Sequence, residues 1–311
     1  IGKSPFIMKL KEQIKKLSLT ESRIFIFGPA GSGKELVARK IHKNSNRAKK
    51  SLIILSGALL DPEKYELELF GSENNDGTIL YGALEKASNG ILLIDEVSEI
   101  PLETQAKILR VLTDQKFRRL NGNHDINVDV RIICTSSKDI SKEIEDGNFR
   151  EDLYHRLNVV PINLEPLKNR TEDIPLLIDY FSKTISNSYG VPKFEIDTNN
   201  LYLFEYDWPG NVRELRNLVE RIAILSPNEK KENINMIINE SLKKVSINKT
   251  DISEKNFSFP LKEARENFEK SYLTLQLKKF KGNISKTADF VGMERSALHR
   301  KLKTLGIKGI N

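Results

Sequence analysis

The sequence predicts an α/β fold, in which a parallel sheet carries helices on both faces and an all-helical region follows. Short apolar runs, bounded by turn or charged residues, recur through the first half of the chain, and helical patterns separate them. Only helical patterns continue from about residue 172 to residue 245. Because parallel strands need long crossover connections, alternating strands and helices favour a parallel sheet.

Four strands are predicted to be buried in this sheet. They lie at Arg23–Phe27, Leu52–Leu55, Ile91–Ile94 and Val128–Cys134. Each is short and largely apolar, which is typical of strands covered on both faces. The single cysteine, Cys134, excludes an internal disulfide, and its apolar neighbours predict a packed core thiol.

The composition is typical of a globular protein of about two domains. No apolar run is long enough to span a bilayer and no signal-peptide pattern is present, so we expect a cytoplasmic protein without membrane contact. The net charge of +7 is consistent with nucleic-acid binding, but a lysine bias from an AT-rich genome gives the same number. The chain begins at Ile1 rather than Met, which indicates a fragment.

Four segments follow from these patterns. Residues 1–168 are expected to form the α/β part and residues 169–245 a helical subdomain. Residues 246–258 are polar with few large apolar side chains, which predicts a linker. Residues 259–311 form a last helical domain in this interpretation.

A glycine-rich segment, Gly28–Lys34, follows the first strand and opens a helix that runs from Lys34 to about His42. A phosphate-binding loop needs this context, because glycines let backbone N–H groups approach phosphate oxygens and the lysine reaches the outer phosphates. Glu35 replaces the usual Ser or Thr after the lysine. A glycine-rich turn without a ligand is the alternative.

The run Ile91–Ile94 ends in two acids, which strengthens the phosphate-site interpretation. Asp95 would hold Mg²⁺, directly or through water, and Glu96 would polarise an attacking water. A strand that simply runs into an acidic loop is the weaker alternative once a phosphate-binding loop precedes it.

Three arginines are candidates for the same site. Arg150 and Arg156 lie six residues apart, and either could neutralise the γ-phosphate of a neighbouring subunit. Surface ion pairing is the commoner role of an arginine. Arg213 follows Pro209 and Gly210 at the start of a helix, from which it could project toward a nucleotide.

The end of the chain predicts a helix-turn-helix. A short helix over Asn283–Val291 is followed by Gly292 and by a basic helix, Arg295–Leu305. From Ile284 to the end there are six basic residues against two acids, a net +4. The outer face of the second helix supplies the candidate DNA contacts: Arg295, Ser296, His299, Arg300 and Lys303. Lys301 and Lys303 are the candidates for phosphate contacts.

An amphipathic helix is predicted ahead of this motif. Its apolar residues recur at steps of three and four: Leu261, Ala264, Phe268, Tyr272 and Leu275. Packing within its own domain and dimerisation on a palindromic operator both fit this pattern.

Taken together, these motifs resemble the AAA+ ATPases of bacterial enhancer-binding proteins, which activate sigma-54 RNA polymerase. The segments that carry the resemblance are Ile1–Ser4, Gly28–Glu35, Ile94–Glu96, Val128–Ser137, Phe149–Asn158 and Trp208–Arg213. Further segments resemble the NtrX-type response regulators: Gly82–Ala87, Phe259–Arg265, Phe268–Tyr272 and Gly292–Leu302. The resemblance covers nearly the whole chain.

The resemblance implies a P-loop AAA+ ATPase with a helical lid subdomain and a C-terminal Fis-type helix-turn-helix. It implies ATP and Mg²⁺ as cofactors, with Glu96 as catalytic residue and Arg150 and Arg156 acting from a neighbouring subunit in a ring or filament. The residues it implies at the nucleotide are Ile1 and Gly2 near adenine, and Gly28, Gly31, Ser32, Gly33, Lys34, Glu35, Asp95 and Arg213. It also implies a receiver domain, phosphorylated by a cognate sensor kinase, that was removed or lies before Ile1.

Three departures from the family pattern stand out. The stretch Gly71–Ala83 is shorter than the family's sigma-contacting loop and lacks its aromatic-threonine tip. Ser56 replaces an asparagine that holds the catalytic glutamate, and the sensor segment ends in Ser136 and Ser137 instead of Thr and Asn.

Three hypotheses follow. The first is a DNA-binding two-component regulator with residual ATPase activity and doubtful polymerase contact. The second is a working ATP-dependent sigma-54 activator, and the third a nucleotide-gated DNA binder without hydrolysis.

Overall fold

The central element of the structure is a five-stranded parallel sheet. The computed structural model describes residues 1–58, 61–74, 77–190, 194, 196–198, 200–225, 231–247, 269–270, 272–277, 280 and 282–306. They form two units, Ile1–Glu240 and Ser241–Asn311, which are described separately below. No helix in this described part of the chain is long and apolar enough to cross a membrane.

The sheet has the strand order β2-β5-β8-β1-β9, and every pair is parallel, so the predicted α/β fold is confirmed. Its strands are β1 (Ile24–Phe27), β2 (Leu52–Ser56), β5 (Ile91–Asp95), β8 (Arg131–Ser136) and β9 (Val160–Asn163). The predicted strand at Val128 begins three residues later, at Arg131. The edge strand β9 was not predicted.

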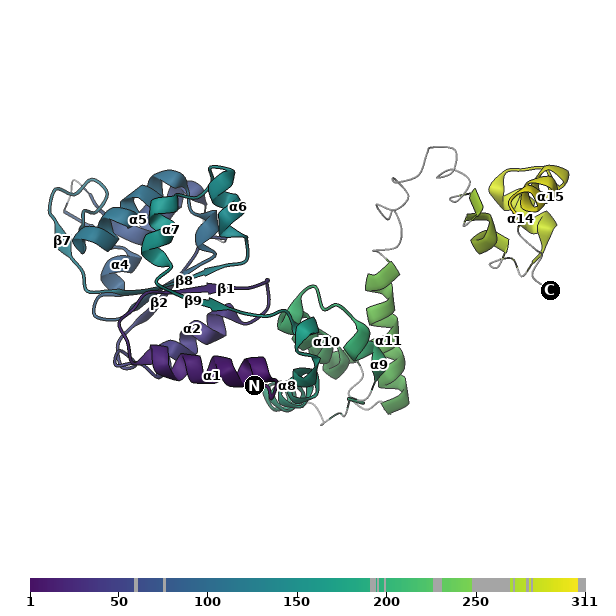
Figure 1. Ribbon diagram of the computed structural model, residues 1–311, viewed down its shortest axis with the longest axis horizontal. Coiled ribbons are helices and arrows are strands. Elements are labelled where there is room, and N and C mark those ends of the chain that lie inside the picture. Colours follow the sequence, from purple (N-terminus) through teal and green to yellow (C-terminus); the bar gives the residue numbers. More distant parts are fainter. Residues whose placement is uncertain are drawn as a thin grey trace. The chain divides into compact units, whose positions relative to one another are not determined.

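Helices cover both faces of this sheet (Figure 1). One face carries α1 (Pro5–Ser18) and α2 (Lys34–Lys43), and the other carries α5 (Leu102–Asp114) and α7 (Glu151–Leu157). Successive residues of β5 point to opposite faces: Ile91 and Leu93 pack toward α1 and α2, whereas Leu92 and Ile94 pack on the other side. Two apolar cores therefore fix the sheet from both sides.

Shorter elements lie beside the second face. They are α3 (Pro62–Phe70), β3 (Gly71–Glu73), β4 (Ile79–Tyr81), α4 (Ala83–Lys86), β6 (Lys116–Phe117), β7 (Ile126–Asn127) and α6 (Ile140–Glu145). The pairs β3–β4 and β6–β7 are antiparallel. Cys134 is buried in the core on this side as a free thiol, as the sequence predicted, and burial raises its pKa.

A helical region completes the first unit. Short 3₁₀ turns at Leu167–Asn169 and Thr171–Asp173 lead into α8 (Ile174–Tyr189), α9 (Leu201–Glu205) and α10 (Asn211–Leu225). Helices α8 and α10 pack together and bury Leu215, Leu218 and Ile222. The following helix, α11 (Lys231–Ile247), includes the first two residues of the predicted linker.

The second unit is built on two short helices, α14 (Ile284–Val291) and α15 (Arg295–Thr304). Their core contains Ala288, Leu298 and Leu302, together with Leu273 and Leu277 from the helical residues 272–277. Gly292 ends α14 in a left-handed conformation, which is common for a glycine at the end of a helix. The rest of the predicted linker, 248–258, lies outside the described residues.

Candidate nucleotide site and DNA-binding surface

The predicted phosphate-site residues converge at the carboxyl edge of the sheet. Gly28 follows β1, Asp95 and Glu96 lie at the end of β5, and Ser137 follows β8. Because β5 and β8 are neighbours and β8 adjoins β1, these three strand ends meet. Ligands of open α/β sheets bind at this edge.

The glycine-rich loop packs tightly against the segment before α10 and contains a buried polar group without a partner among the described residues. Gly31 has φ +74°, and a Cβ atom there would overlap the carbonyl oxygen of Gly210. The hydroxyl of Ser32 is buried and has no hydrogen-bond partner among the described residues. A buried, unsatisfied hydroxyl beside a helix N-terminus fits a loop that binds phosphate.

Lys34, Glu96 and Ser137 form a closed hydrogen-bonded group, here called the lysine–glutamate–serine cluster. The Lys34 Nζ lies 3.0 Å from Glu96 Oε1 and 2.5 Å from Ser137 Oγ, and it also donates to Gly28 O at 2.9 Å. Ser137 donates its hydroxyl to Glu96 Oε1 at 2.6 Å and its backbone N–H to Glu96 Oε2 at 2.7 Å.

The charge of Glu96 is stabilised by this cluster. Burial alone would raise its pKa, but the hydrogen bonds from Ser137 and Lys34 and the positive charge of Lys34 outweigh burial and lower the pKa of the carboxyl. Glu96 itself adopts a left-handed backbone conformation, with φ 53° and ψ 58°.

Asp95 is oriented by a different residue. Thr135 donates its hydroxyl to Asp95 Oδ1 at 2.6 Å and accepts the backbone N–H of Glu96 at 3.0 Å. Ser56, which replaces the family's asparagine, stands opposite Asp95 in the β2–β5 register. Within the described chain, no hydrogen bond joins the Ser56 side chain to Glu96, so Ser137 holds the carboxylate instead.

The helical region contacts the glycine-rich loop directly. Asn211 donates from Nδ2 to Ala30 O at 2.9 Å, and the backbone N–H of Val212 donates to Gly31 O at 3.1 Å. Arg213 is exposed at the start of α10, close to Gly31. The start of α10 therefore covers the loop, and Arg213 lies beside it.

Two buried charges near this contact were missed in the sequence. Arg170 donates to Ser32 O at 3.0 Å, its Nε is buried without a described partner, and burial lowers its pKa. Asp173 accepts hydrogen bonds from Lys3 N, Ser4 N and Ser4 Oγ at 2.7–2.9 Å. These bonds fix the segment after Ile1 and Gly2 at the start of the helical region. No local pattern distinguishes either charge from a surface residue.

The candidate arginine pair lies outside the cluster. Arg150 precedes α7 and makes a two-pronged ion pair with Asp152, with bonds of 2.7 and 3.0 Å. Arg156 is exposed on α7, and neither arginine contacts the lysine–glutamate–serine cluster. Glu35, another predicted site residue, pairs with Arg39 one helical turn along α2, at 2.7 Å.

The stretch Gly71–Ala83 forms a short hairpin. Strands β3 and β4 pair antiparallel, and Asn74 N donates to Thr78 O at 2.9 Å close to the turn. The side chains of Ile79, Leu80 and Tyr81 are exposed. Arg119 anchors the hairpin by donating to both carboxylate oxygens of Glu85, at 2.6 and 2.9 Å, and its guanidinium lies over the Tyr81 ring.

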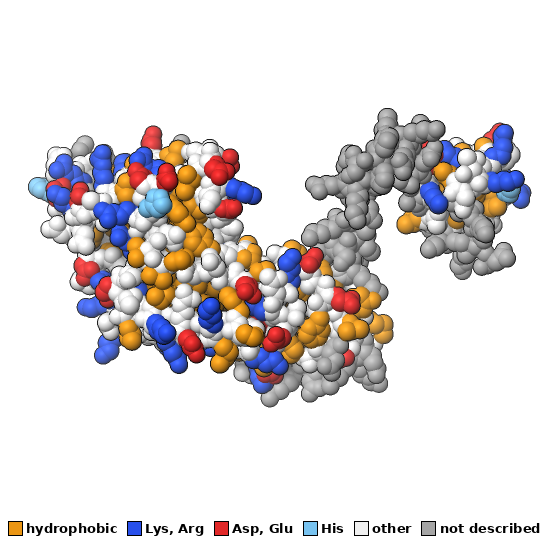
Figure 2. All heavy atoms as spheres, in the orientation of Figure 1, with side chains coloured by type: hydrophobic (Ala, Val, Ile, Leu, Met, Phe, Trp, Pro, Cys, Tyr) orange, Lys and Arg blue, Asp and Glu red, His pale blue; other side chains and the backbone are white. Residues whose placement is uncertain are grey.

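The second unit presents the predicted DNA contacts on its surface. Arg295, Ser296, His299, Arg300 and Lys303 are all exposed, whereas Leu298 and Leu302 are buried. Figure 2 shows basic side chains on the visible face of this unit. Lys301 does not belong with them, because its ammonium pairs with Glu269 at 3.0 Å.

The predicted amphipathic seam is only partly described. Leu261, Ala264 and Phe268 lie outside the described residues. Tyr272 and Leu275 are 40% and 63% exposed, and the neighbouring Leu273 and Leu277 fill the core of the unit instead. The seam therefore remains a prediction.

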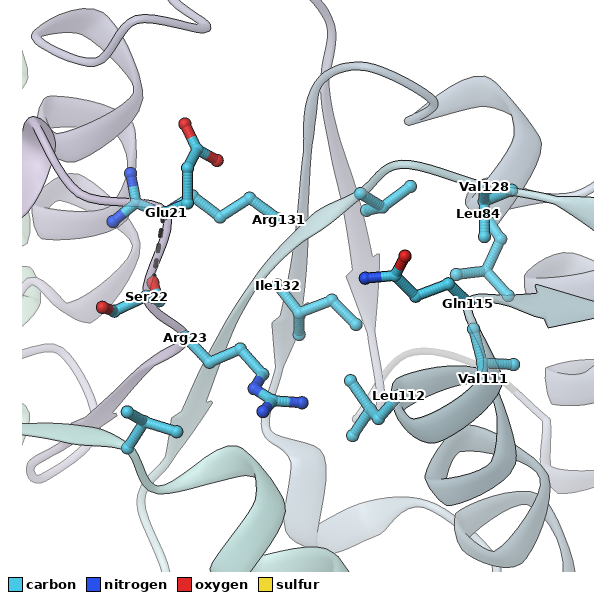
Figure 3. Close-up of a pocket in the computed structure, with 12 residues that line it drawn as sticks. Glu21, Ser22, Arg23, Leu84, Val111, Leu112, Gln115, Val128, Arg131 and Ile132 are labelled. Atoms are coloured by element: carbon cyan, nitrogen blue, oxygen red, sulfur yellow. Dashed lines mark hydrogen bonds between the residues drawn. The ribbon is translucent and has the colours of Figure 1, made fainter.

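Two cavities border the sheet at opposite edges. One, of about 520 Å³, lies beside Gly28, Pro29 and Ser137. The other, of about 280 Å³, lies where β1 and β8 begin, and Arg23 points into it beside Leu112 and Ile132 (Figure 3). Of the predicted nucleotide-site residues, Gly28 lines the first cavity and none lines the second.

Comparisons with known proteins agree with this architecture. The Sigma-54 interaction domain family matches residues 1–163, the AAA+ ATPase lid domain residues 168–254, and the Fis family of bacterial regulatory proteins residues 264–305. The chain belongs to the sigma-54 activator family of bacterial regulators. The resemblance predicted from the sequence is thereby confirmed.

Relatives within this family include NtrX regulators. The nitrogen assimilation regulatory protein NtrX of Azorhizobium caulinodans is 45% identical over 312 residues, covering 99% of this chain and 69% of the relative. Crystal structures of NtrX from Brucella abortus in complex with ADP and with ATP are 46% and 45% identical, with TM-scores of 0.75 and 0.73. Each covers 98% of this chain, which spans 68–69% of those chains.

Proposed function

We propose that this chain is the ATPase and DNA-binding part of a two-component transcription regulator of the NtrX type, which binds ATP and hydrolyses it slowly. The lysine–glutamate–serine cluster carries the proposal, because it joins a phosphate-loop lysine to the carboxylate that would activate water. The exposed basic face of α15, in the same chain, supports DNA as the second ligand.

Nucleotide binding is supported by polar groups that need a partner. The buried Ser32 hydroxyl and the buried Arg170 Nε both lack one among the described residues, and both border the glycine-rich loop. The ADP and ATP complexes of the Brucella abortus relative support the same ligand class here. We infer that Gly28, Gly31, Gly33 and Lys34 bind the phosphates, and that Ile1 and Gly2 lie near the base.

The neighbouring acids Asp95 and Glu96 would have different roles in hydrolysis. Asp95, oriented by Thr135, would hold Mg²⁺, which supplies charge neutralisation between the phosphates when bound. Glu96 would accept a proton from water while the water oxygen bonds to the γ-phosphorus. The bond from that phosphorus to the β-phosphate oxygen breaks, and ADP and phosphate leave.

Arginines would neutralise the remaining negative charge of the nucleotide phosphates. Arg213, beside Gly31, is the candidate within the same subunit. Arg150 and Arg156 lie away from their own loop, so we infer that they serve a neighbouring subunit through head-to-tail contacts. Glu35 faces Arg39 rather than the loop, which supports a structural role for its carboxylate.

Hydrolysis is tested by phosphate release from purified protein with ATP and Mg²⁺, compared with a Glu96→Gln variant. We expect a slow rate that falls at least about a hundredfold in the variant, because a positioned base contributes 10²–10⁴-fold. Equal rates would favour a nucleotide-gated DNA binder that does not hydrolyse ATP.

Contact with sigma-54 polymerase is proposed to be lost or weakened. The segment where the family has its sigma-contacting loop is the short β3–β4 hairpin, and it has no aromatic-threonine tip. The match to the Sigma-54 interaction domain over residues 1–163 favours the alternative, a working activator. ATP-dependent open complexes at a sigma-54 promoter, formed with purified protein, would overturn the loss and support the alternative.

Regulation and DNA binding make up the remaining proposals. We infer that the protein dimerises on DNA through its C-terminal unit, lies in the cytoplasm where bacterial DNA is found, and responds to a sensor kinase through a receiver domain. Footprinting of the protein on genomic DNA tests the DNA-binding part. A footprint that disappears with Arg295→Ala supports it, and no protection at any site would overturn it.

A further inference from the structure

The cavity where β1 and β8 begin contains a charged group that the proposed hydrolysis does not use. Its volume is about 280 Å³, and it lies at the edge of the sheet opposite the glycine-rich loop. Arg23, immediately before β1, points into it beside Leu112 and Ile132 (Figure 3). A cavity with its own charged side chain, separate from the phosphate-binding edge, is a candidate site for a second ligand.

The Arg23 guanidinium has no hydrogen-bond or ion-pair partner in the part of the chain that the structure describes. The side chain is partly buried, and burial, followed by the positive charge of Arg156, lowers its pKa. A guanidinium nevertheless stays charged in proteins, so leaving one unpaired in a partly enclosed place is unfavourable. An anionic ligand beside Arg23 would offset that cost.

The other charged residues of this cavity leave its lining positive. Arg131 is 3% exposed and donates to the backbone oxygens of Ser22 and Leu17, and its Nη1 is buried without a partner among the described residues. Glu21 is the acid of the lining, and its carboxylate already pairs with Arg47 at 2.8 Å. With two arginines and one acid, the lining attracts an anion.

Most of the remaining lining is aliphatic, and it includes Leu84, Val111, Leu112, Val128 and Ile132. Gln115, immediately after α5, extends its amide toward Ile132 and can donate a further hydrogen bond (Figure 3). Such a lining favours a molecule with a short hydrocarbon body and an oxyanion at one end. A carboxylate matches the planar fork of a guanidinium, whereas a free phosphate has no apolar part to place against the aliphatic side chains.

We propose that this cavity binds a small aliphatic carboxylate, whose oxygens pair with Arg23 and whose hydrocarbon part packs against Leu112 and Ile132. The amide of Gln115 supplies a further donor to the ligand. The volume of the cavity restricts the ligand to a small molecule. The site lies away from the glycine-rich loop, so this inference does not depend on whether the chain binds or hydrolyses ATP.

The test is titration of the purified protein with butyrate, followed by saturation-transfer difference NMR. We expect saturable binding with a Kd of about 1–10 mM, as is usual for so small a ligand. Butyramide has the same shape without the charge and should bind at least about tenfold more weakly, because it loses the charge-assisted hydrogen bonds. Inorganic phosphate, which has the charge without the hydrocarbon part, should also bind at least about tenfold more weakly.

Three variants locate the ligand within the cavity. Arg23→Gln should weaken butyrate binding at least about tenfold and leave the Tm unchanged or raised, because it removes an unpaired charge. Gln115→Glu places a like charge on the lining and should weaken binding as well. Arg110→Gln is the matched control, since Arg110 is exposed on α5 and does not line this cavity, and it should bind butyrate as the unchanged protein does.

The proposal is overturned if butyrate shows no saturable binding, or if butyramide or phosphate binds equally well. A Tm for Arg23→Gln below that of Arg110→Gln would mean that Arg23 stabilises the fold itself, and would also overturn it. Sedimentation velocity addresses a different occupant. If Arg23→Gln changes the association state but not butyrate binding, Arg23 pairs with a carboxylate of a second copy of the chain instead of a small molecule.

Discussion

The side-chain amide of Asn211 donates a hydrogen bond to the carbonyl oxygen of Ala30, at 2.9 Å, and so joins the start of α10 to the glycine-rich loop. The same side chain accepts the backbone N–H of Leu167 at 2.8 Å. Asn211 is 2% exposed and has φ +52°, a conformation that asparagine tolerates better than most residues. One residue therefore connects the loop, the lid helix and the segment between them.

Asn211→Ala should destabilise the protein and weaken nucleotide binding. It leaves the buried N–H of Leu167 unpaired, at a cost of about 1–3 kcal/mol, and it removes the hydrogen bond to the carbonyl of Ala30. For a unit of this size, we expect the Tm to fall by about 5 °C. Asn211→Asp is the control, since it retains an oxygen for Leu167 but loses the donor to Ala30. Equal Tm values for all three proteins would contradict this account.

The sequence predicted the central sheet because its inner strands are continuous apolar runs. The edge strand β9 escaped prediction because Pro161 interrupts it, and proline is tolerated there only because an edge strand needs fewer paired N–H groups. The fourth strand was predicted to begin at Val128, three residues before it does, because apolar residues alone do not show which N–H groups bond within the sheet. Val128 is apolar and buried, but its N–H bonds to Gln115 O rather than to a strand of the sheet.

The candidate site was predictable where residues directly follow strands. Gly28 follows β1, Asp95 ends β5 and Glu96 follows it, while Lys34 begins the helix after the glycine-rich loop, so their types and spacing were sufficient. The bond from Ser137 to Glu96 depends on β5 and β8 being neighbours, and strand order has no local signal in the sequence. Arg170 and Asn211 act on the loop from well over a hundred residues away, which no periodic pattern reveals.

Arg156 is predicted to be the more important member of the arginine pair. Arg150 is held by Asp152, whereas Arg156 is exposed and forms no ion pair with a described residue. Because an arginine finger contributes about 10³-fold or more to phosphate transfer, Arg156→Ala should reduce the ATPase rate at least about a hundredfold. Arg150→Ala should reduce it less. Steady-state phosphate release by the two variants is the measurement.

Mixing experiments test whether Arg156 acts on a neighbouring subunit. Lys34→Ala lacks a working phosphate loop but retains Arg156. Arg156→Ala retains the phosphate loop but lacks the arginine. If the arginine serves the adjacent subunit, a mixture of the two inactive variants recovers part of the ATPase rate. A mixture that stays as inactive as its components would rule out action between subunits.

The two lysines on α15 should differ in their effect on DNA affinity. Lys303 is exposed, while Lys301 pairs with Glu269 at 3.0 Å. Loss of one phosphate contact reduces the slope of log K against log salt by about 1, so Lys303→Ala should show this change on any duplex. Lys301→Ala should leave the slope unaltered. Fluorescence anisotropy with a labelled duplex at several salt concentrations distinguishes the two, and equal slopes for both variants would contradict the assignment.

Arg119 is predicted to hold the β3–β4 hairpin against the rest of the molecule. It binds both carboxylate oxygens of Glu85, lies 3.7 Å from a carboxylate oxygen of Glu73 and stacks over Tyr81 at 5.4 Å from the ring centre. Arg119→Ala removes these contacts together, so the amides of β3 and β4 should exchange with solvent about tenfold faster. Arg118→Ala is the matched control, because among the described residues Arg118 forms an ion pair only with the exposed Asp125. Arg119→Lys should give an intermediate rate, since an ammonium cannot bind both oxygens in the same geometry. If hairpin exchange is the same in all four proteins, Glu85 is not its anchor.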